Sequence, residues 1–246
     1  MISTGVAKPA LINWGAGLVA DYVLADPIAT ARRARTEPTE LRRDLVAQPN
    51  RRRDRAANLG TRVHHRAAAI VLGTPYPADP EVEPYAQQLA KFFRRWRVDF
   101  ERDVEAVETT VLNRTHGYAG TGDLWLWLPT GPFGRWQLWL IDYKTSATRP
   151  AAQAFPEQAF QLAAYRHAEV ALLPDDTEVP APRPHRTAVL NLRARSHALV
   201  ELPSGRDVFR AFLGALRTAT YLHGAPSEYP LVMPPSLVGP PIRRAA

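Results

Sequence analysis

The stretch GTGDLWLWLPTGPFGRWQLWLIDYKTS, residues 120–146, contains two runs of leucine and tryptophan separated by a segment rich in glycine and proline. Each run has the length and apolar content of a buried β-strand, and the segment between them is typical of a turn, so the stretch predicts an antiparallel hairpin. Asp123 precedes the first run and Asp142 follows the second. Lys144 lies two residues after Asp142, and its side chain therefore lies on the same face of the strand.

The positions of two turns predict which acidic residues face one another across the strands. A turn centred in PTGPFGR places Asp123 opposite Asp142, and a preceding turn centred in NRTHG places Glu108 on the other side of Asp123. Directly opposed residues have Cβ atoms about 5 Å apart, where like charges destabilise a sheet. A divalent cation would offset this repulsion, and carboxylate oxygens suit Mg²⁺ or Mn²⁺. The alternative is that the three acids are strand-edge charges with Lys144 as their ion-pair partner.

Positive charge is concentrated in one N-terminal segment. The chain has a net charge of +7, and residues 31–66 contain 11 Arg and 4 acidic residues, which accounts for the whole excess. A localised basic segment is typical of proteins that contact DNA phosphates, and the candidates are Arg51, Arg52, Arg53 and Arg55. An arginine-rich, solvated helix face is the alternative. Only 3 of the 31 basic residues are lysines, so the lysine retained at position 144 is informative.

Hydrophobic periodicity predicts helices and strands in mixed order. We expect helices over residues 9–48 with a break at Pro27, and over 56–72, 81–103, 155–173 and 207–223. We expect strands over residues 104–112, 122–128, 136–144, 186–193 and 198–202, and a surface loop in PDDTEVPAPRP. The first three strands form an antiparallel meander in an α/β fold with one compact domain. Its parts are a mainly helical N-terminal part with the basic arm (1–103), a core (104–225) and an irregular proline-rich tail (226–246).

Composition excludes several classes of protein. Apolar residues make up 46% and charged residues 22% of the chain, which is typical of a folded domain. Cysteine is absent, which excludes disulfides, thiolate zinc sites, iron–sulfur clusters and a cysteine nucleophile. No apolar run approaches the roughly 20 residues of a membrane span, and the N-terminus lacks the layout of a signal peptide. We therefore expect a cytoplasmic protein without membrane contact.

Four short motifs occur in a defined order along the chain. They are Gly60-Thr-Arg-Val-His64, Gly120-Thr-Gly-Asp123, Asp142-Tyr-Lys144 and Gln161-Leu-Ala-Ala-Tyr165. In this order, over about residues 5–225, they resemble the PD-(D/E)XK nuclease superfamily, and in particular its RecB-like branch of phage exonucleases and related CRISPR-associated adaptation nucleases. Asp142 is a departure, because many relatives have glutamate there. The absence of cysteine excludes the iron–sulfur cluster that many CRISPR-associated relatives carry.

The resemblance implies a restriction-endonuclease-like core, in which helices flank a central mixed sheet and an N-terminal helical extension is added. It also implies a site for Mg²⁺ or Mn²⁺ with Lys144 near the attacking water, and Gln161 and Tyr165 one helical turn apart, where they position Lys144 or the DNA. Glu108 is either a further carboxylate of this site or a simple strand residue. The implied metal ligands are His64, Asp123, Asp142 and the backbone carbonyl of Tyr143, and the implied catalytic residues are Asp123, Asp142, Lys144, Gln161 and Tyr165.

The function implied by the resemblance is metal-dependent hydrolysis of DNA phosphodiester bonds. The expected enzyme is an exonuclease that acts on linear or single-stranded DNA in recombination, repair or phage DNA metabolism, with recombination proteins as partners. A catalytically inactive DNA-binding accessory protein with the same fold is an alternative, although such a protein would be expected to lose Asp123, Asp142 or Lys144. A basic structural protein whose motif matches are accidental is a second alternative.

Overall fold

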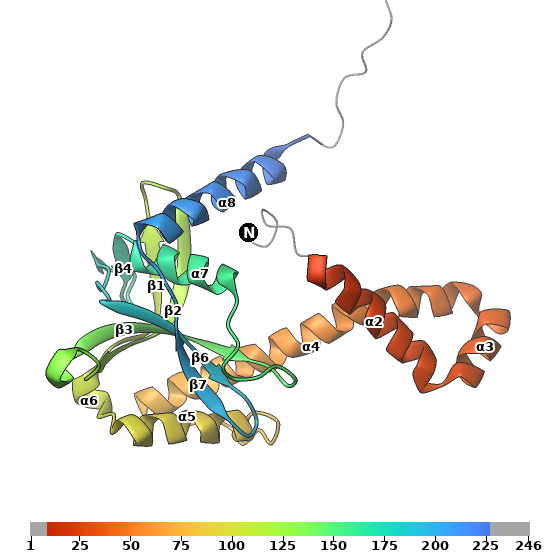
Figure 1. The fold of residues 1–246 in the computed structure, drawn as a ribbon, viewed down its shortest axis with the longest axis horizontal. Helices are drawn as coiled ribbons and strands as arrows, with labels where there is room; N and C mark the ends of the chain where they lie inside the picture. The colour runs from red at the N-terminus through yellow and green to blue at the C-terminus, as the bar shows by residue number, and fades with distance from the viewer. Residues whose placement is uncertain (1–8, 227–246) are drawn as a thin grey trace, which may run out of the picture.

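A mixed β-sheet of seven strands lies at the centre of the protein, for which a computed structural model describes residues 9–226 (Figure 1). The order of the strands across the sheet is β5-β4-β1-β2-β3-β6-β7, and only β3 and β6 pair in parallel. The expected α/β class and the antiparallel meander are confirmed. The strands are β1 (Val104–Asn113), β2 (Tyr118–Leu128), β3 (Gln137–Thr145), β4 (Val170–Leu172), β5 (Glu178–Pro180), β6 (Arg186–Leu192) and β7 (His197–Glu201).

Seven α-helices in the described part of the chain surround this sheet or extend from it. α4 and α5 cover one face, α7 covers the other, and α8 packs on α7 (Figure 1). A short 3₁₀ helix (Pro132–Gly134) forms the turn between β2 and β3. The helices are α2 (Pro9–Ala25), α3 (Pro27–Thr36), α4 (Pro38–Leu72), α5 (Glu83–Trp96), α6 (Phe100–Asp103), α7 (Pro156–Arg166) and α8 (Arg206–Gly224).

The register of the meander agrees with the positions of its turns. Leu124 of β2 pairs with Ile141 of β3, so one step further along the same register Asp123 lies opposite Asp142, as predicted. β1 pairs with β2 on either side of Glu108, and the same register places Glu108 opposite Asp123. The three acids therefore lie in one row across β1, β2 and β3.

Alternation along the strands divides the core between the two faces of the sheet. Leu124 and Ile141 pack toward α4 and α5, whereas Trp125 and Leu140 pack toward α7. Trp125 is fully buried, as expected for a tryptophan that fills a core. The two-sided burial explains why the central strands are nearly continuous apolar runs and not alternating ones.

The longest helix, α4, differs from the prediction. α4 continues without interruption through Pro49, whereas we expected a gap between residues 48 and 56. The break expected at Pro27 is confirmed, and a second break lies at Pro38. These prolines begin α3 and α4 and lose no helical hydrogen bond there. Pro49 packs against α2 at Gly15, where a Cβ would lie 3.5 Å from the Pro49 ring. This packing offsets part of the roughly 3 kcal/mol that a proline costs inside a helix.

Two further expected helices, over residues 81–103 and 155–173, are too long. α5 ends where Arg97 adopts a left-handed φ of 51°, and Asp99 then caps the short α6. α7 ends at Arg166, and β4 follows because it pairs with β1. β5 lies within the segment expected to be a loop and pairs with β4. The expected tail after residue 226 lies outside the described residues.

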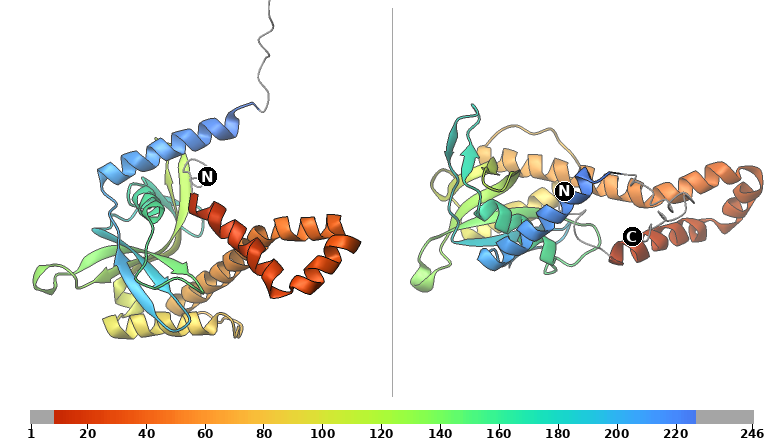
Figure 2. Two further views of the ribbon diagram at one scale, coloured as in Figure 1. Left: turned by 45° about the vertical axis from the view of Figure 1, so that its right-hand side comes forward. Right: turned by 90° about the horizontal axis from the view of Figure 1, so that it is seen from above.

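The N-terminal helices form an arm that extends away from the sheet (Figure 2). α2 and α3 pack on the first half of α4, where the Arg33 guanidinium donates hydrogen bonds of 2.8 Å to Tyr22 and to Asp44. Leu41 is the only buried residue between positions 11 and 50. The expected helical extension is therefore present, with little core of its own. No helix within residues 9–226 is long and apolar enough to cross a membrane.

Candidate metal centre

A polar cleft of about 430 Å³ lies between α4, the middle of β1 and the end of β3. The residues that α4 contributes are mostly small, which leaves space between the helix and the sheet. The cleft is lined by Ala56, Ala57, Gly60, Thr61, His64, His65, Glu108, Tyr143, Lys144 and Thr145.

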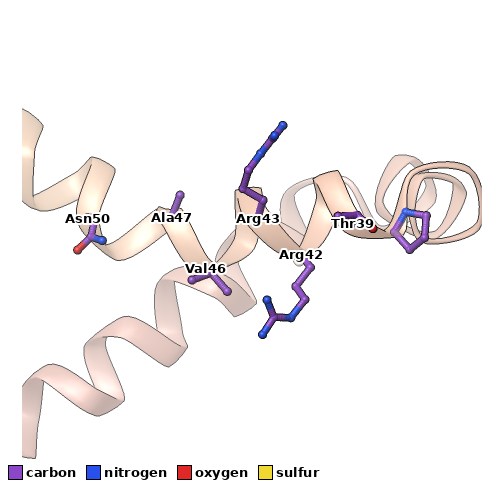
Figure 3. Close-up of a pocket in the computed structure, with 7 residues that line it drawn as sticks. Thr39, Arg42, Arg43, Val46, Ala47 and Asn50 are labelled. Carbon is purple, nitrogen blue, oxygen red and sulfur yellow. The ribbon is translucent and has the colours of Figure 1, made fainter. Parts of the chain in front are cut away.

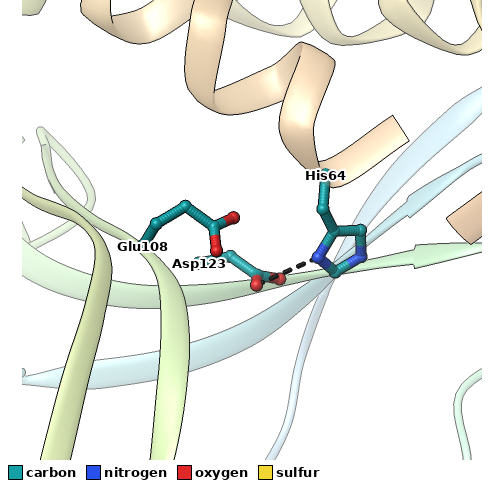
Figure 4. Close-up of side chains that lie close together, drawn as sticks. All are labelled: His64, Glu108 and Asp123. Atoms are coloured by element: carbon teal, nitrogen blue, oxygen red, sulfur yellow. Dashed lines mark hydrogen bonds and ion pairs between the residues drawn. The ribbon is translucent and has the colours of Figure 1, made fainter. Parts of the chain in front are cut away.

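Three side chains with metal-binding atoms converge at this cleft. Their ligand atoms, from His64 of α4, Glu108 of β1 and Asp123 of β2, all lie within 4.8 Å of one another (Figure 4). His64 Nδ1 is 3.1 Å from Asp123 Oδ1, and His64 Nε2 is 3.0 Å from the carbonyl oxygen of Tyr143. One imidazole and two carboxylates thus form a group that could hold a metal ion, and the carbonyl of Tyr143 lies beside it.

Asp123 is fixed by the backbone of the neighbouring strand. It is 6% exposed, and its Oδ2 accepts a 2.6 Å hydrogen bond from the backbone N–H of Tyr143. The ladder between β2 and β3 ends at Leu124, so the Asp123 side chain takes the place of the next backbone acceptor. This bond leaves Oδ1 directed at His64.

Glu108 has an unusual backbone and an unpaired carboxylate oxygen. Its φ of 44° lies in the left-handed region, which a glutamate in a strand rarely adopts. Its Oε1 is buried without a hydrogen-bond partner. Burial raises the pKa of Glu108 to about 7, and the charge of Asp123 adds to this shift. A cation between these carboxylates would supply the missing partner, so the residues present fit a divalent metal.

The charge on His64 depends on the same carboxylates. Burial opposes its protonation, but the hydrogen bond to Asp123 and the charges of Asp123, Asp142 and Glu108 outweigh burial and raise the pKa of His64. His64 also packs edge-on against the Tyr143 ring, with centroids 5.8 Å apart. The imidazole is therefore held by contacts on both its ring nitrogens and its face.

A second polar network lies beside the first, on the α7 side of the sheet. Asp142 is 1% exposed, and its Oδ1 accepts a 2.9 Å hydrogen bond from Gln161 Nε2. Asp142 Oδ2 lies 2.5 Å from Lys144 Nζ in an ion pair that lacks hydrogen-bond geometry. Lys144 Nζ in turn donates to Gln161 Oε1 at 3.1 Å, and Gln161 Nε2 also donates to the Tyr165 hydroxyl at 3.1 Å. Burial raises the pKa of Asp142, and the charge of Lys144 opposes this shift.

The glycines of the GTGD motif make room for this network. A Cβ at Gly120 would lie 2.5 Å from a ring carbon of Tyr165, and one at Gly122 would lie 2.2 Å from the ring of Trp125. The two aromatic rings therefore sit directly over β2. The absence of a side chain at Gly120 allows the Tyr165 ring to lie against β2, and its absence at Gly122 does the same for the Trp125 ring.

The structure places the residues of the expected ligand set in two adjacent groups. His64, Asp123 and the Tyr143 carbonyl lie together, with Glu108 beside them. Asp142 contacts Gln161 and Lys144 in the second network.

Arg193 fixes the end of β3 and was not predicted as a site residue. Arg193 is 8% exposed and donates hydrogen bonds to the carbonyl oxygens of Lys144 and Arg149, at 2.9 and 2.7 Å. In a chain so rich in arginine, no signal distinguished this position. The backbone that carries Lys144 is thus held by a buried guanidinium.

The four arginines expected to contact DNA lie exposed on α4. Arg51 forms an ion pair with Asp44, and Arg53 forms one with the adjacent Asp54. Arg52 and Arg55 form no ion pair with another residue of the described range. All four belong to the helix that carries His64, so the basic segment and the cleft are parts of one element.

Comparison with known proteins adds no family to this description. The chain matches no protein-family model, and no curated protein is significantly similar to it in sequence. The resemblance to nucleases therefore depends on the four motifs and on the arrangement of their residues.

Proposed function

We propose that this protein is a metal-dependent DNA nuclease with a restriction-endonuclease-like core. The observation that carries the proposal is the convergence of His64, Glu108 and Asp123 beside the pair formed by Asp142 and Lys144. The first group can hold a divalent cation, and the second presents an ammonium at the same cleft. Phosphodiester hydrolysis needs both an activated water and neutralisation of the charge that develops on the phosphate.

Each part of the site has a role in the proposed reaction. A bound Mg²⁺ or Mn²⁺ would lower the pKa of a water and polarise a phosphate oxygen. Lys144 Nζ, oriented by Gln161 and paired with Asp142, donates a hydrogen bond to the phosphate or to the attacking water. In the reaction, the water oxygen bonds to phosphorus, the bond to the leaving oxygen breaks, and a proton passes to that oxygen. Tyr165 holds Gln161 and is a positioning residue.

The proposed substrate is DNA with a free end or a single-stranded region. The continuity of basic α4 with the cleft supports DNA as the ligand, because exposed arginines neutralise phosphates without reading bases. An exonuclease in recombination, repair or phage DNA metabolism is the activity that the motif resemblance favours, with recombination proteins as possible partners.

The proposal is tested by incubating the purified chain with linear and circular DNA, single- and double-stranded, in Mg²⁺, Mn²⁺ or EDTA. We expect degradation of linear DNA with either metal and none in EDTA. His64→Ala and Lys144→Ala should lose activity by orders of magnitude. His223→Ala is the control, because His223 lies exposed on α8 and belongs to neither the cleft nor the ligand group, and it should retain activity.

Three outcomes would decide against all or part of the proposal. Intact DNA under all metal conditions would refute the nuclease and, if the protein still binds DNA, would favour the inactive accessory protein. Rapid cleavage of circular DNA would replace the exonuclease by an endonuclease. Full activity of Lys144→Ala would remove Lys144 from the mechanism.

A further inference from the structure

One face of α4 continues from the cleft toward the N-terminal arm. At 100° per residue, seven residues between the start of α4 and His64 lie within about 40° of the direction of His64. All but Gly60 of these seven are exposed. They are Thr39, Arg42, Val46, Asn50, Arg53, Ala57 and Gly60.

A second hollow lies at the far end of this face. It has a volume of about 620 Å³ and is lined by α4 alone, in particular by Arg42, Arg43, Val46 and Asn50 (Figure 3). The two guanidinium groups extend to opposite sides of the helix, and Val46 lies about one turn further along α4 (Figure 3). Val46 is 62% exposed, so an apolar surface lies open beside the two cations.

The charges of this face are available to a ligand. Neither Arg42 nor Arg43 forms an ion pair with another residue of the range 9–226. Asp44, the nearest acid in sequence, points to the other side of the helix, where it binds Arg33 and Arg51. Arg53 pairs with Asp54, but both are exposed, and such pairs are weak enough to exchange for a phosphate.

We propose that Arg42, Arg43 and Val46 form a distal subsite for the DNA whose scissile phosphate lies at the metal centre. This inference rests on the proposed function, because it assigns both hollows to one substrate. The guanidinium groups bind phosphates, and Val46 contacts a sugar or base beside them. α4 carries both subsites on one face, and neither subsite needs a sequence-specific contact.

The length of α4 predicts the length of DNA that reaches both subsites. Arg42 precedes His64 by 22 residues, which at 1.5 Å per residue is about 33 Å. Duplex DNA rises by about 3.4 Å per base pair, so the distal subsite contacts DNA about 10 base pairs from the cleavage site. Shorter DNA can occupy the metal centre without reaching Arg42.

Two other arginines of α4 provide a matched control for Arg42 and Arg43. Arg52 and Arg55 belong to the same helix and the same basic segment, but their directions differ from that of His64 by more than 100°. Removal of Arg42 and Arg43 or of Arg52 and Arg55 lowers the net charge equally. A general attraction of DNA to a basic helix would make the two double variants equivalent, whereas a distal subsite makes them different.

The experiment measures binding in EDTA, so that cleavage does not interfere. Fluorescein-labelled DNA of 6, 12, 18 and 24 nucleotides, single-stranded and duplex, is titrated with wild type, Arg42→Ala/Arg43→Ala and Arg52→Ala/Arg55→Ala. We expect the first variant to lose about tenfold or more in affinity for 18- and 24-mers and less than threefold for 6-mers. The second should lose less than threefold at every length. Arg42→Lys/Arg43→Lys should retain most of the affinity, and thermal denaturation checks that each variant is folded.

Several results would overturn the inference. Equal losses of DNA affinity in the two alanine variants would indicate a general electrostatic attraction. An equal loss of affinity of Arg42→Ala/Arg43→Ala for DNA of every length would refute the predicted distance between the two subsites. Absence of DNA binding by the wild type would refute both this inference and the proposed function. Length-dependent binding without cleavage in Mg²⁺ or Mn²⁺ would sustain the distal subsite while the nuclease fails. Cleavage of DNA by the wild type, together with equal losses of affinity in the two double variants, would support the nuclease and refute the distal subsite.

Discussion

Replacement of Glu108 by glutamine tests whether this residue is held in place for a cation. Glu108→Gln preserves the size of the side chain and removes its charge. Burial and the charge of Asp123 raise the pKa of Glu108 to about 7 from an ordinary 4.5, so the folded, metal-free protein is destabilised when Glu108 ionises. The full difference corresponds to about 3 kcal/mol. Because Glu108 is only half-buried, solvent screening reduces this to about 1–2 kcal/mol.

The pH dependence follows from the direction of this shift. A raised carboxyl pKa destabilises the folded state fully above pH 7, less as the pH falls through 7, and not at all below about 4.5. In EDTA at pH 8, we expect Glu108→Gln to increase the free energy of unfolding by about 1–2 kcal/mol, or the melting temperature by about 2–8 °C. Near pH 5 the variant and the wild type should differ little.

The assay is thermal denaturation at pH 8 and pH 5, in EDTA and in MnCl₂. Mn²⁺ should raise the melting temperature of the wild type more at pH 8 than at pH 5, and this increase should be much smaller in Glu108→Gln. Glu105→Gln is the matched control, because Glu105 lies exposed on the same strand and accepts a hydrogen bond from Trp127. A lower melting temperature of Glu108→Gln in EDTA at pH 8, or an undiminished Mn²⁺ effect, would refute the reasoning.

Three further substitutions test the second network. Gln161→Leu leaves Asp142 and Lys144 without their shared amide and should cost about 1–3 kcal/mol, measured by urea denaturation. Gly120→Ala places a methyl group against the Tyr165 ring and should cost about 1–3 kcal/mol; in a double-mutant cycle, Tyr165→Ala should remove much of this cost. Lys144→Met removes the cation beside Asp142, so the pKa of Asp142 rises further and the loss of stability should be larger at pH 8 than at pH 5.

The central hairpin was predictable because its local signals agree. The Gly- and Pro-rich turn fixed the register of β2 and β3, and that register placed Asp123 opposite Asp142. β4 and β5 were not predictable, since each is three residues long and exists through pairing with a neighbour. We expected a gap between residues 48 and 56, but α4 continues through Pro49, which packs against Gly15. Tertiary contacts, which local patterns do not contain, decided these elements.

The sequence predicted which residues form the candidate site better than it predicted how their side chains are arranged. His64, Asp123 and the Tyr143 carbonyl meet as the motifs imply. The role of Glu108 could not be decided from the sequence. The positions of the turns predict which residues face one another across the strands, but they do not reveal the left-handed φ of the Glu108 backbone. Asp142 was assigned to the metal, yet its contacts are with Lys144 and Gln161. Side-chain direction at the end of a strand depends on partners that are distant in sequence.

The two contacts of the His64 ring have a consequence for how a metal enters. Asp123, when ionised, and the Tyr143 carbonyl are both acceptors, so both ring nitrogens must donate, and His64 then carries a positive charge. The positively charged imidazolium lies among the carboxylates, in agreement with the raised pKa of His64. A histidine that ligates a metal must be neutral, so metal uptake is an exchange in which a proton leaves as the ion arrives. The affinity for metal should therefore increase with pH, and the metal-free centre is already neutralised in part by its own side chain.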